Sequence, residues 1–388
     1  LAKTPGAPDS SKGISLFVVP KFILKENGDP GERNGVTCGS IEKKMGIHGN
    51  ATCVLNYDGA KGWMVGEEHK GLAAMFVMMN AARLGVGLQG LAQAEVAYQN
   101  AVTYALDRRQ GRALAGPAEP EEKADPIFVH PDVRRMLMDA KVFNEGMRAL
   151  CLWGALQVDL THQAQTEEER QLADDLIGLM TPVIKGYGTD KGYDIANNMQ
   201  QVYGGHGYVK EWGMEQFVRD SRIAMIYEGT NGVQAMDLCG RKLASKGGRA
   251  IGAFFAAVEE EIASTKQIEG LEGVASKMEA ALEEQKTATN WFMANALSNL
   301  NHLGAGAHHY MHIMGIVTLG FMWLKQAKVS KAALERSPED AAFYEAKLTS
   351  AAYYAERFLP DATALRIKLE AGSDNMMKLP EDAFATAA

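Results

Sequence analysis

Beyond about residue 67 the chain consists almost entirely of long stretches with helical periodicity, and no other feature of the sequence limits its fold as strongly. The first stretch, Leu72 to Arg109, is rich in alanine and repeats apolar residues at helical spacing. Further helices are predicted over residues 130–165 and 166–185 and, as a separate segment, over about 250–370. Candidate strands occur only before residue 67, at residues 13–20 and 52–57. The sequence therefore predicts a mainly α fold with a partial β domain.

These changes of character predict three domains. Residues 1–66 are the remainder of a β domain, residues 67–246 form a helical domain, and residues 247–388 form a helical extension that begins at the Gly247–Gly248 break. Two or three strands cannot bury a sheet face by themselves. We therefore expect the sequence to begin part-way through a domain.

The composition is that of a soluble globular protein, with 46% hydrophobic and 23% charged residues among 388. A net charge of -8 and the lack of a basic stripe argue against a nucleic-acid partner. The sequence shows no signal peptide, and its most apolar stretch, Ile313–Trp323, is too short to cross a membrane. We expect no membrane span and a cytoplasmic location.

The four cysteines are scattered along the chain without the spacing of a metal site. We expect them to be reduced thiols, with no structural disulfide. They are Cys38, Cys53, Cys151 and Cys239.

Gly85, Gly87 and Gly90 match the spacing of a dinucleotide-binding fingerprint, and Asp107 follows at the distance of its acidic residue. No strand precedes these glycines, however, and no βαβ unit surrounds them. We interpret them as a small helix face that permits close packing, and we predict no nicotinamide site.

Four histidines lie close together in the sequence, at His302, His308, His309 and His312, and two of them, His308 and His312, share a helix face. Zinc sites need three or four convergent ligands, and no carboxylate stands at a neighbouring ligand spacing. We therefore predict no metal and interpret these residues as buried or interfacial histidines.

Residues 200–241 contain the densest group of residue types that chemistry can use. Glu228 falls in a joint between two helical runs, Gly229 permits an unusual backbone turn, and Thr230 or Asn231 can cap the next helix. Apolar neighbours would partly desolvate the Glu228 carboxylate and suit it to act as a general base. The alternative is a solvated acid that favours the dipole of the following helix.

This segment closely resembles the catalytic and flavin-binding signature of the acyl-CoA dehydrogenase family, and Ile226–Thr230 matches the context of the family's proton-abstracting glutamate. The resemblance spans nearly the whole chain, and the C-terminal extension is that of a bacterial long form. It implies an acyl-CoA dehydrogenase-like fold, with a helical-bundle catalytic domain that binds FAD and acyl-CoA and a helical C-terminal extension. It also implies that the N-terminal domain and part of the middle β domain are absent from this sequence.

By this resemblance, the reaction is the FAD-dependent α,β-dehydrogenation of an acyl-CoA thioester to a trans-2-enoyl-CoA. Glu228 would remove the α-proton while the β-hydrogen leaves as a hydride to the flavin. The residues implied to contact the substrate are Asn80, Arg83 and Gly229. The residues implied to contact the cofactor are Arg108, Gln201, Gly204, Gly205, Thr230, Asn231 and Gly232.

Arg108 is implied to reach the flavin pyrophosphate of a neighbouring subunit, and its guanidinium group offers the planar pair of hydrogen bonds that a diphosphate accepts. The alternative is a solvated charge at a helix end. The Phe-Gly that usually follows in the family is replaced here by Gly111–Arg112. An aromatic contact with the cofactor is therefore not matched at this place.

The resemblance implies 3-methylthiopropanoyl-CoA or a fatty acyl-CoA as the substrate, and hence a role in sulfur or fatty acid metabolism. It implies an electron-transfer flavoprotein as the electron acceptor and, because some cofactor contacts cross subunits, a homodimer or higher homo-oligomer. Two alternatives stay open, namely an acyl-CoA oxidase and a truncated, non-catalytic helical scaffold paralogue.

Overall fold

The computed structural model describes residues 1–296, 298–336 and 338–384 of the chain. The chain forms two compact units, Leu1–Ala82 and Arg83–Ala388, and each is described by itself. Among these described residues, strands occur only in the first unit, and most residues are helical. The predicted fold class, mainly α with a small β part, is confirmed, whereas the predicted domain limits stay a prediction.

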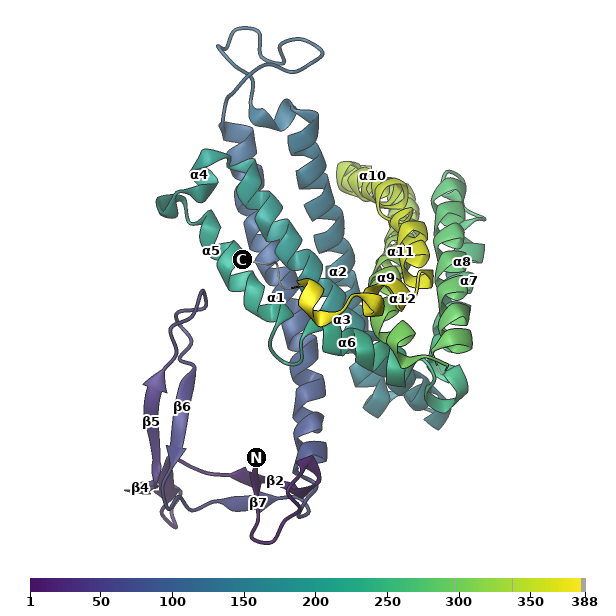
Figure 1. The fold of residues 1–388 in the computed structure, drawn as a ribbon. Coiled ribbons are helices and arrows are strands. Elements are labelled where there is room, and N and C mark those ends of the chain that lie inside the picture. The colour runs from purple at the N-terminus through teal and green to yellow at the C-terminus, as the bar shows by residue number, and fades with distance from the viewer. Residues whose placement is uncertain (297, 337, 385–388) are drawn as a thin grey trace. The chain divides into compact units, whose positions relative to one another are not determined.

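The first unit is built from short antiparallel strands (Figure 1). One sheet has the order β1–β2–β7, formed by Ala2–Lys3, Ile14–Val18 and Trp63–Val65. Two ribbons pair β3 (Phe22–Leu24) with β4 (Pro30–Arg33), and β5 (Val36–Ile41) with β6 (Cys53–Tyr57). A single 3-10 turn, Ser11–Gly13, precedes β2. The two strands predicted from the sequence correspond to β2 and β6.

These strands bury almost nothing. Ser15 is their single buried residue, while Leu55 on β6 and Trp63 on β7 are 49% and 54% exposed. Because exposed apolar strand faces contribute little to stability, the expectation that these strands form no core of their own is confirmed.

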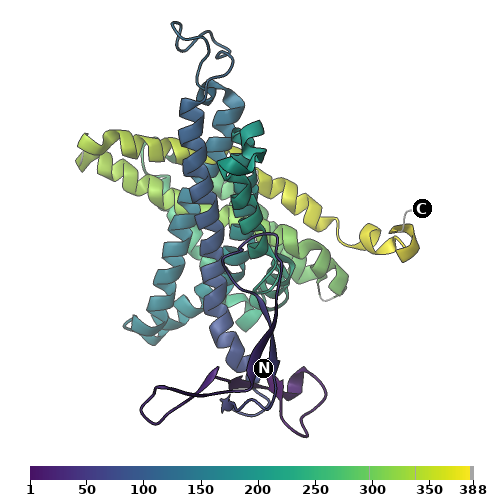
Figure 2. The ribbon, with the colours of Figure 1, turned by 90° about the vertical axis from the view of Figure 1, so that its left-hand side faces the viewer.

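The second unit is helical, and α1 (Gly71–Asp107) enters it from the first. Its other long helices are α2 (Pro131–Gln163), α3 (Glu167–Val202), α7 (Arg249–Thr265), α8 (Glu272–Asn295), α9 (Leu300–Arg336) and α10 (Ala341–Arg357). The shorter ones are α4 (Gly205–Tyr208), α5 (Met214–Arg222), α6 (Asn231–Asp237), α11 (Asp361–Glu370) and α12 (Asp374–Lys378). The 3-10 turns are Ile127–Val129, Lys210–Trp212, Ile223–Met225, Ser245–Gly248, Pro338–Asp340 and Glu381–Phe384, and Leu238–Lys242 forms a π turn. In Figure 2 the C-terminal helices run across α3, which α9 contacts.

Helix α3 begins where the sequence predicts but continues much further, to Val202 instead of residue 185. Thr166 and Glu169 form a reciprocal capping box at its start. Glycines at 186, 188 and 192 have low intrinsic helix propensity. Each of them nevertheless lies so close to another helix that a Cβ atom would come within 2.3–2.5 Å of a neighbouring atom. Tertiary packing therefore extends the helix through a stretch that local propensity does not favour.

The fingerprint-like glycines lie where α1 and α3 approach each other backbone to backbone. A Cβ on Gly87 would stand 2.7 Å from the carbonyl oxygen of Ile184, and one on Gly90 would stand 2.7 Å from that of Gly188. Gly85 has nothing within 4 Å of its Cβ position. The interpretation as a helix-packing face is confirmed for Gly87 and Gly90 but not for Gly85.

Helix α9 passes through the core of the second unit. From Tyr310 to Leu324 every residue except His312 is buried, and the indole N–H of Trp323 donates to the carbonyl oxygen of Val142 at 3.0 Å. This stretch is therefore a core helix.

Among the described residues, one helix is long and apolar enough to cross a membrane, and it is α1. The expectation that no apolar stretch reaches that length was therefore wrong. Core helices of soluble proteins pass the same test of length and composition, so α1 assigns no membrane location by itself.

The close approach of α1 and α3 gives a prediction about stability. Gly90→Ala should lower the free energy of unfolding by about 1–3 kcal/mol, because its methyl group would press on backbone atoms of α3. Gly85→Ala, on the same helix with open space around it, should be neutral or stabilising by up to about 1 kcal/mol. Urea denaturation followed by circular dichroism measures both. Equal effects at the two positions would contradict the packing argument.

Candidate active site

Glu228 lies in a short loop between the 3-10 turn Ile223–Met225 and helix α6, as the sequence predicts. Its φ angle is 58°, and that of Gly229 is 83°, so two successive residues adopt the left-handed conformation. For a residue with a side chain, this conformation costs on the order of 1 kcal/mol. The surroundings of the loop must therefore hold it in place.

Three buried side chains bind the carbonyl oxygens of this left-handed pair. Gln234 Nε2 lies 3.2 Å from both oxygens, and Arg83 Nε donates to that of Glu228 at 3.4 Å. Lys185 Nζ donates to the oxygen of Gly229 at 2.8 Å. Hydrogen bonds from cationic groups are stronger than neutral ones, and two of the three donors are cationic. The loop is thus held from α1, α3 and α6 together.

The two cations under the loop have different partners. Arg83 is 5% exposed and forms an ion pair with Asp237 at 3.3 Å. Lys185 is fully buried in α3, and burial lowers the pKa of its amine to about 8, with Asp190 opposing this shift and Arg83 adding to it.

The carboxylate of Glu228 has an oxygen without a partner. Glu228 Oε2 is buried and accepts no hydrogen bond within the described part of the chain. The neighbouring Tyr227 hydroxyl donates instead to Gln89 of α1. A buried, unpaired carboxylate oxygen is costly unless a ligand or substrate uses it, and it is suited to accept a proton.

The residues after Glu228 are placed by the start of α6. Thr230 caps this helix by accepting from the backbone N–H of Val233 at 3.4 Å, which confirms the predicted cap. Asn231 is 7% exposed, and its side-chain oxygen accepts from Lys185 at 2.8 Å. The Asn231 side chain therefore faces the protein interior, and Gly232 follows it in the first turn of α6.

A second group of predicted residues meets at the C-terminal end of α3. Arg108, Gly204 and Gly205 line one cavity of about 240 Å³. Tyr104 and Tyr203 stack with ring centroids 4.0 Å apart beside it, and neither glycine has an atom within 4 Å of its Cβ position. Gln201, predicted to join them, has an exposed side chain and does not line this cavity.

The substitution of Gly111–Arg112 for the family's Phe-Gly has a structural consequence. Arg112 forms an ion pair with the fully buried Asp125 at 3.2 Å. Asp125 also accepts from the backbone N–H groups of Ala113 and Glu119. Arg112, at the position of the glycine in the Phe-Gly pair, thus stabilises its own loop.

Two family models match separate parts of the chain. Residues 69–243 match the family described as "Acyl-CoA dehydrogenase, C-terminal domain". Residues 254–380 match the one described as "Acetyl-CoA dehydrogenase C-terminal like". The chain belongs to the acyl-CoA dehydrogenase family.

Curated relatives align with this acyl-CoA dehydrogenase family member over almost its whole length. It is 37% identical to the 3-methylmercaptopropionyl-CoA dehydrogenase of Ruegeria pomeroyi, over 97% of this chain and 63% of that protein. It is 35% identical to FadE5 of Mycobacterium tuberculosis, a broad-specificity linear acyl-CoA dehydrogenase, over 99% of this chain and 65% of that protein. The chain thus spans less than two thirds of the length of these relatives.

A solved structure shares the fold. The acyl-CoA dehydrogenase of Bacillus anthracis, complexed with FAD, matches with a TM-score of 0.68 and 18% identity, over 89% of this chain and 59% of that one. The predicted acyl-CoA dehydrogenase-like fold is therefore confirmed.

Not every site residue implied by the family resemblance lies in the loop around Glu228. Asn80 is exposed on α1 within the first unit, so the structure assigns it no relation to Glu228. Arg83 binds the backbone carbonyl oxygen of Glu228. The individual substrate and cofactor roles of these residues stay predictions.

Sequence reasoning missed Lys185, Gln234 and Asp237. A single lysine within the apolar stretch from Met180 to Tyr187 is a signal that could have identified the first. It also missed that Asp190 of α3 lies beside His308 and His312, with one ligand atom of each residue within 4.8 Å of the others. No carboxylate is near these histidines in the sequence, but the fold places the Asp190 carboxylate beside them, so the premise of the prediction was wrong. The prediction of no metal stays a prediction.

Lys185 gives a prediction about pH. Lys185→Met removes the donor to Gly229 and Asn231 and should destabilise the protein by about 1–3 kcal/mol. In wild type the folded-state pKa of about 8 lies below the unfolded value, so between the two the unfolded state binds more protons. Wild-type stability should therefore rise with pH relative to the variant, which makes the loss larger near about pH 9 than near about pH 7. Urea unfolding at both pH values measures this difference.

Lys191→Met is the matched control for this change. Lys191 lies on the same helix and pairs at the surface with Asp194 at 3.2 Å. Its loss should change stability by less than about 1 kcal/mol. A Lys185→Met effect that is the same at both pH values would show that the amine is not buried as described.

Proposed function

We propose that this chain forms the base-bearing helical part of an FAD-dependent acyl-CoA dehydrogenase, which converts an acyl-CoA thioester to a trans-2-enoyl-CoA. The observation that carries the proposal is the Glu228 carboxylate, with a buried, unpartnered oxygen on a loop held in a left-handed conformation. Family membership supports the class of reaction, and this geometry supports Glu228 as the group that takes the proton.

The residues of the chain would divide the work as follows. Glu228 removes the α-proton, and the electron pair of that C–H bond forms the new double bond as the β-C–H bond breaks. FAD, when bound, supplies the acceptor for the β-hydrogen and its electron pair. The backbone N–H of Glu228 donates to no acceptor in the described part of the chain and can polarise the thioester carbonyl, in the manner of an oxyanion hole.

The cavity beside Arg108 fits part of the cofactor. Its guanidinium suits a diphosphate, and Gly204 and Gly205 leave their backbone open to close approach. About 240 Å³ accommodates only a portion of a dinucleotide, so the remaining contacts would come from other parts of the assembled enzyme.

The substrate that we propose is an acyl-CoA, with 3-methylmercaptopropionyl-CoA as the first candidate and a linear fatty acyl-CoA as the second. The relatives support both, because one is named for the former and the other for linear acyl chains. We also propose a homodimer or higher homo-oligomer, an electron-transfer flavoprotein as the acceptor, a cytoplasmic location and, with the first substrate, a role in sulfur metabolism.

Glu228→Gln tests the assignment of the base. Glutamine keeps the shape of the side chain but cannot accept the proton, so turnover should fall by about 100- to 10,000-fold while acyl-CoA still binds. The measurement is anaerobic bleaching of the oxidised flavin band in the purified, FAD-loaded enzyme, with a panel of acyl-CoAs. Glu211→Gln, at an exposed acid on a separate 3-10 turn, is the control and should bleach like wild type. Normal bleaching by Glu228→Gln would contradict the proposal.

The same spectra, together with an oxygen-consumption assay in air, distinguish the alternatives. A protein that takes up no FAD would favour the scaffold paralogue. Rapid oxygen consumption coupled to acyl-CoA oxidation, without need of an electron-transfer flavoprotein, would favour an oxidase. The substrate that bleaches the flavin at the lowest concentration would identify the acyl group.

Arg108→Leu tests the cofactor cavity. Loss of a charge-assisted hydrogen bond to a diphosphate should weaken FAD binding about 10- to 100-fold. The measurement is the FAD dissociation constant from fluorescence titration of deflavinated protein. Arg148→Leu is the matched control, because this arginine pairs with Glu95 at the surface at 3.0 Å and does not line the cavity. Equal affinities of Arg108→Leu and wild type would remove Arg108 from the cofactor site.

A further inference from the structure

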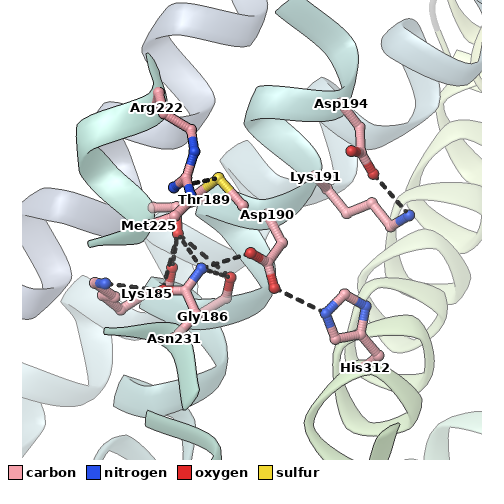
Figure 3. Close-up of polar contacts among 10 residues, drawn as sticks. All are labelled: Lys185, Gly186, Thr189, Asp190, Lys191, Asp194, Arg222, Met225, Asn231 and His312. Atoms are coloured by element: carbon pink, nitrogen blue, oxygen red, sulfur yellow. Dashed lines mark hydrogen bonds and ion pairs between the residues drawn. The ribbon is translucent and has the colours of Figure 1, made fainter. Parts of the chain in front are cut away.

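The C-terminal helix α9 reaches the active-site loop through a short series of hydrogen bonds (Figure 3). His312 Nε2 lies 2.9 Å from Asp190 Oδ2 on α3. The other oxygen of Asp190 accepts from Asn231 Nδ2 at 2.7 Å. Asn231 in turn accepts from Lys185, which binds the carbonyl oxygen of Gly229. Four side chains thus connect α9 to the residue after Glu228.

The amide of Asn231 can take only one orientation in these surroundings. Its oxygen faces the Lys185 amine, which only donates when protonated, and its nitrogen faces the Asp190 carboxylate, which only accepts when ionised. Its nitrogen also lies within hydrogen-bonding distance of Gly186 O and Thr189 Oγ1. A rotated amide would set like groups against each other at both ends.

Asp190 is itself held in place from both sides. Its side chain is 13% exposed, and each of its two oxygens has a partner, Asn231 on one and His312 on the other. Burial works to raise the pKa of Asp190, but the hydrogen bonds from these two residues outweigh it, and the net shift is downward.

Close packing between α9 and α3 places His312 beside Asp190. A Cβ on Gly315 would stand 2.2 Å from the ring of Tyr187, so the two helices touch ring to backbone one turn from the pair. The His312 ring also makes an edge-to-face contact with the Tyr187 ring, with centroids 5.3 Å apart. The position of His312 is therefore fixed by the core and not by a flexible surface contact.

We infer that His312 is a positioning residue for the active site. Through Asp190 it fixes the amide of Asn231, and through Asn231 and Lys185 it fixes the backbone of the Glu228–Gly229 loop. The C-terminal helical segment thereby contributes to the geometry of the base, although none of its residues reaches the loop directly in this chain of contacts. The inference rests on the proposed function for its effect on turnover but not for its effect on the loop.

The rival use of the same residues is a divalent metal site. Asp190, His308 and His312 are near enough to one another to ligate an ion such as Zn²⁺. Without an ion, however, both oxygens of Asp190 are already hydrogen-bonded, and His308 is exposed. The hydrogen-bonded arrangement accounts for Asp190 and His312 without a further ligand, so metal binding is an outcome that the test must distinguish.

His312→Ala tests the inference in the purified, FAD-loaded protein. Residues 226–234 should exchange their backbone hydrogens faster, as measured by mass spectrometry in the absence of substrate. The kcat should fall by about 2- to 30-fold, with a smaller change in KM for acyl-CoA. His312→Gln retains a side-chain N–H donor and should recover most of both readouts. Asp190→Asn, which keeps the size of the side chain, should behave like His312→Ala and serves in its place if the alanine variant does not fold.

His302→Ala is the matched control. His302 lies on the same helix, and its hydrogen bond to Ser373 at 2.9 Å is comparable in length. The variant loses this bond, which is not connected to the Glu228–Gly229 loop. It should leave the exchange of residues 226–234 and kcat unchanged. Hydrogen exchange requires no activity, so a failure of the proposed function would leave this readout intact.

Two results would overturn the inference. One is unchanged exchange of residues 226–234 together with an unchanged kcat in His312→Ala and Asp190→Asn. The other is stoichiometric zinc in the purified wild type, with kcat lost on chelation and restored by Zn²⁺ alone, which would make the cluster a metal site.

Discussion

The left-handed backbone at Glu228 and Gly229 is the constraint on which the rest of the active site depends. Left-handed conformations at residues with side chains persist only where the surroundings over-determine them. Here the two carbonyl oxygens are bound by Arg83, Lys185 and Gln234, which come from three different helices. The direction of the Glu228 side chain is therefore set by how α1, α3 and α6 pack, and only secondarily by the loop's own sequence.

The packing of α1 against α3 depends on glycines, which have no side chain to keep the two backbones apart. Gly87 lies against the carbonyl group of Ile184, directly before Lys185 in the chain, and Gly90 lies one turn further along the same contact. Because no Cβ atoms intervene, α1 and α3 approach closely enough for Arg83 and Lys185 to bind neighbouring carbonyl groups of one loop. Gly87 and Gly90, which match part of a dinucleotide fingerprint, thus act on the site indirectly. They allow close packing of the two helices that carry its cations.

The features that the sequence predicted correctly are local ones. Thr166 and Thr230 cap helices because of residues three positions away, and the joint at Glu228 follows from the periodicity on either side of it. The missed features join distant segments: Lys185 meets Gly229 across 44 residues, and Asp190 meets His312 across 122. Rules based on the spacing of residues in the sequence do not cover such distances. For this reason the Asp190 carboxylate beside His312 could not be predicted from the sequence around the histidine.

The buried polar series from Lys185 to His312 is better explained by orientation than by stability. Burying opposite charges such as Lys185 and Asp190 often stabilises a fold no more than apolar residues of similar size would. The side-chain amide of Asn231 lies between them, and its oxygen accepts whereas its nitrogen donates. With the Lys185 cation on one side and the Asp190 carboxylate on the other, only one orientation of this amide makes both hydrogen bonds. Because Asp190 also depends on His312, that arrangement includes α9, a helix that an isolated catalytic bundle would lack. Helix α9 therefore acts as an inner support of the Glu228–Gly229 loop, and its removal would leave a buried carboxylate facing Asn231 without its second partner.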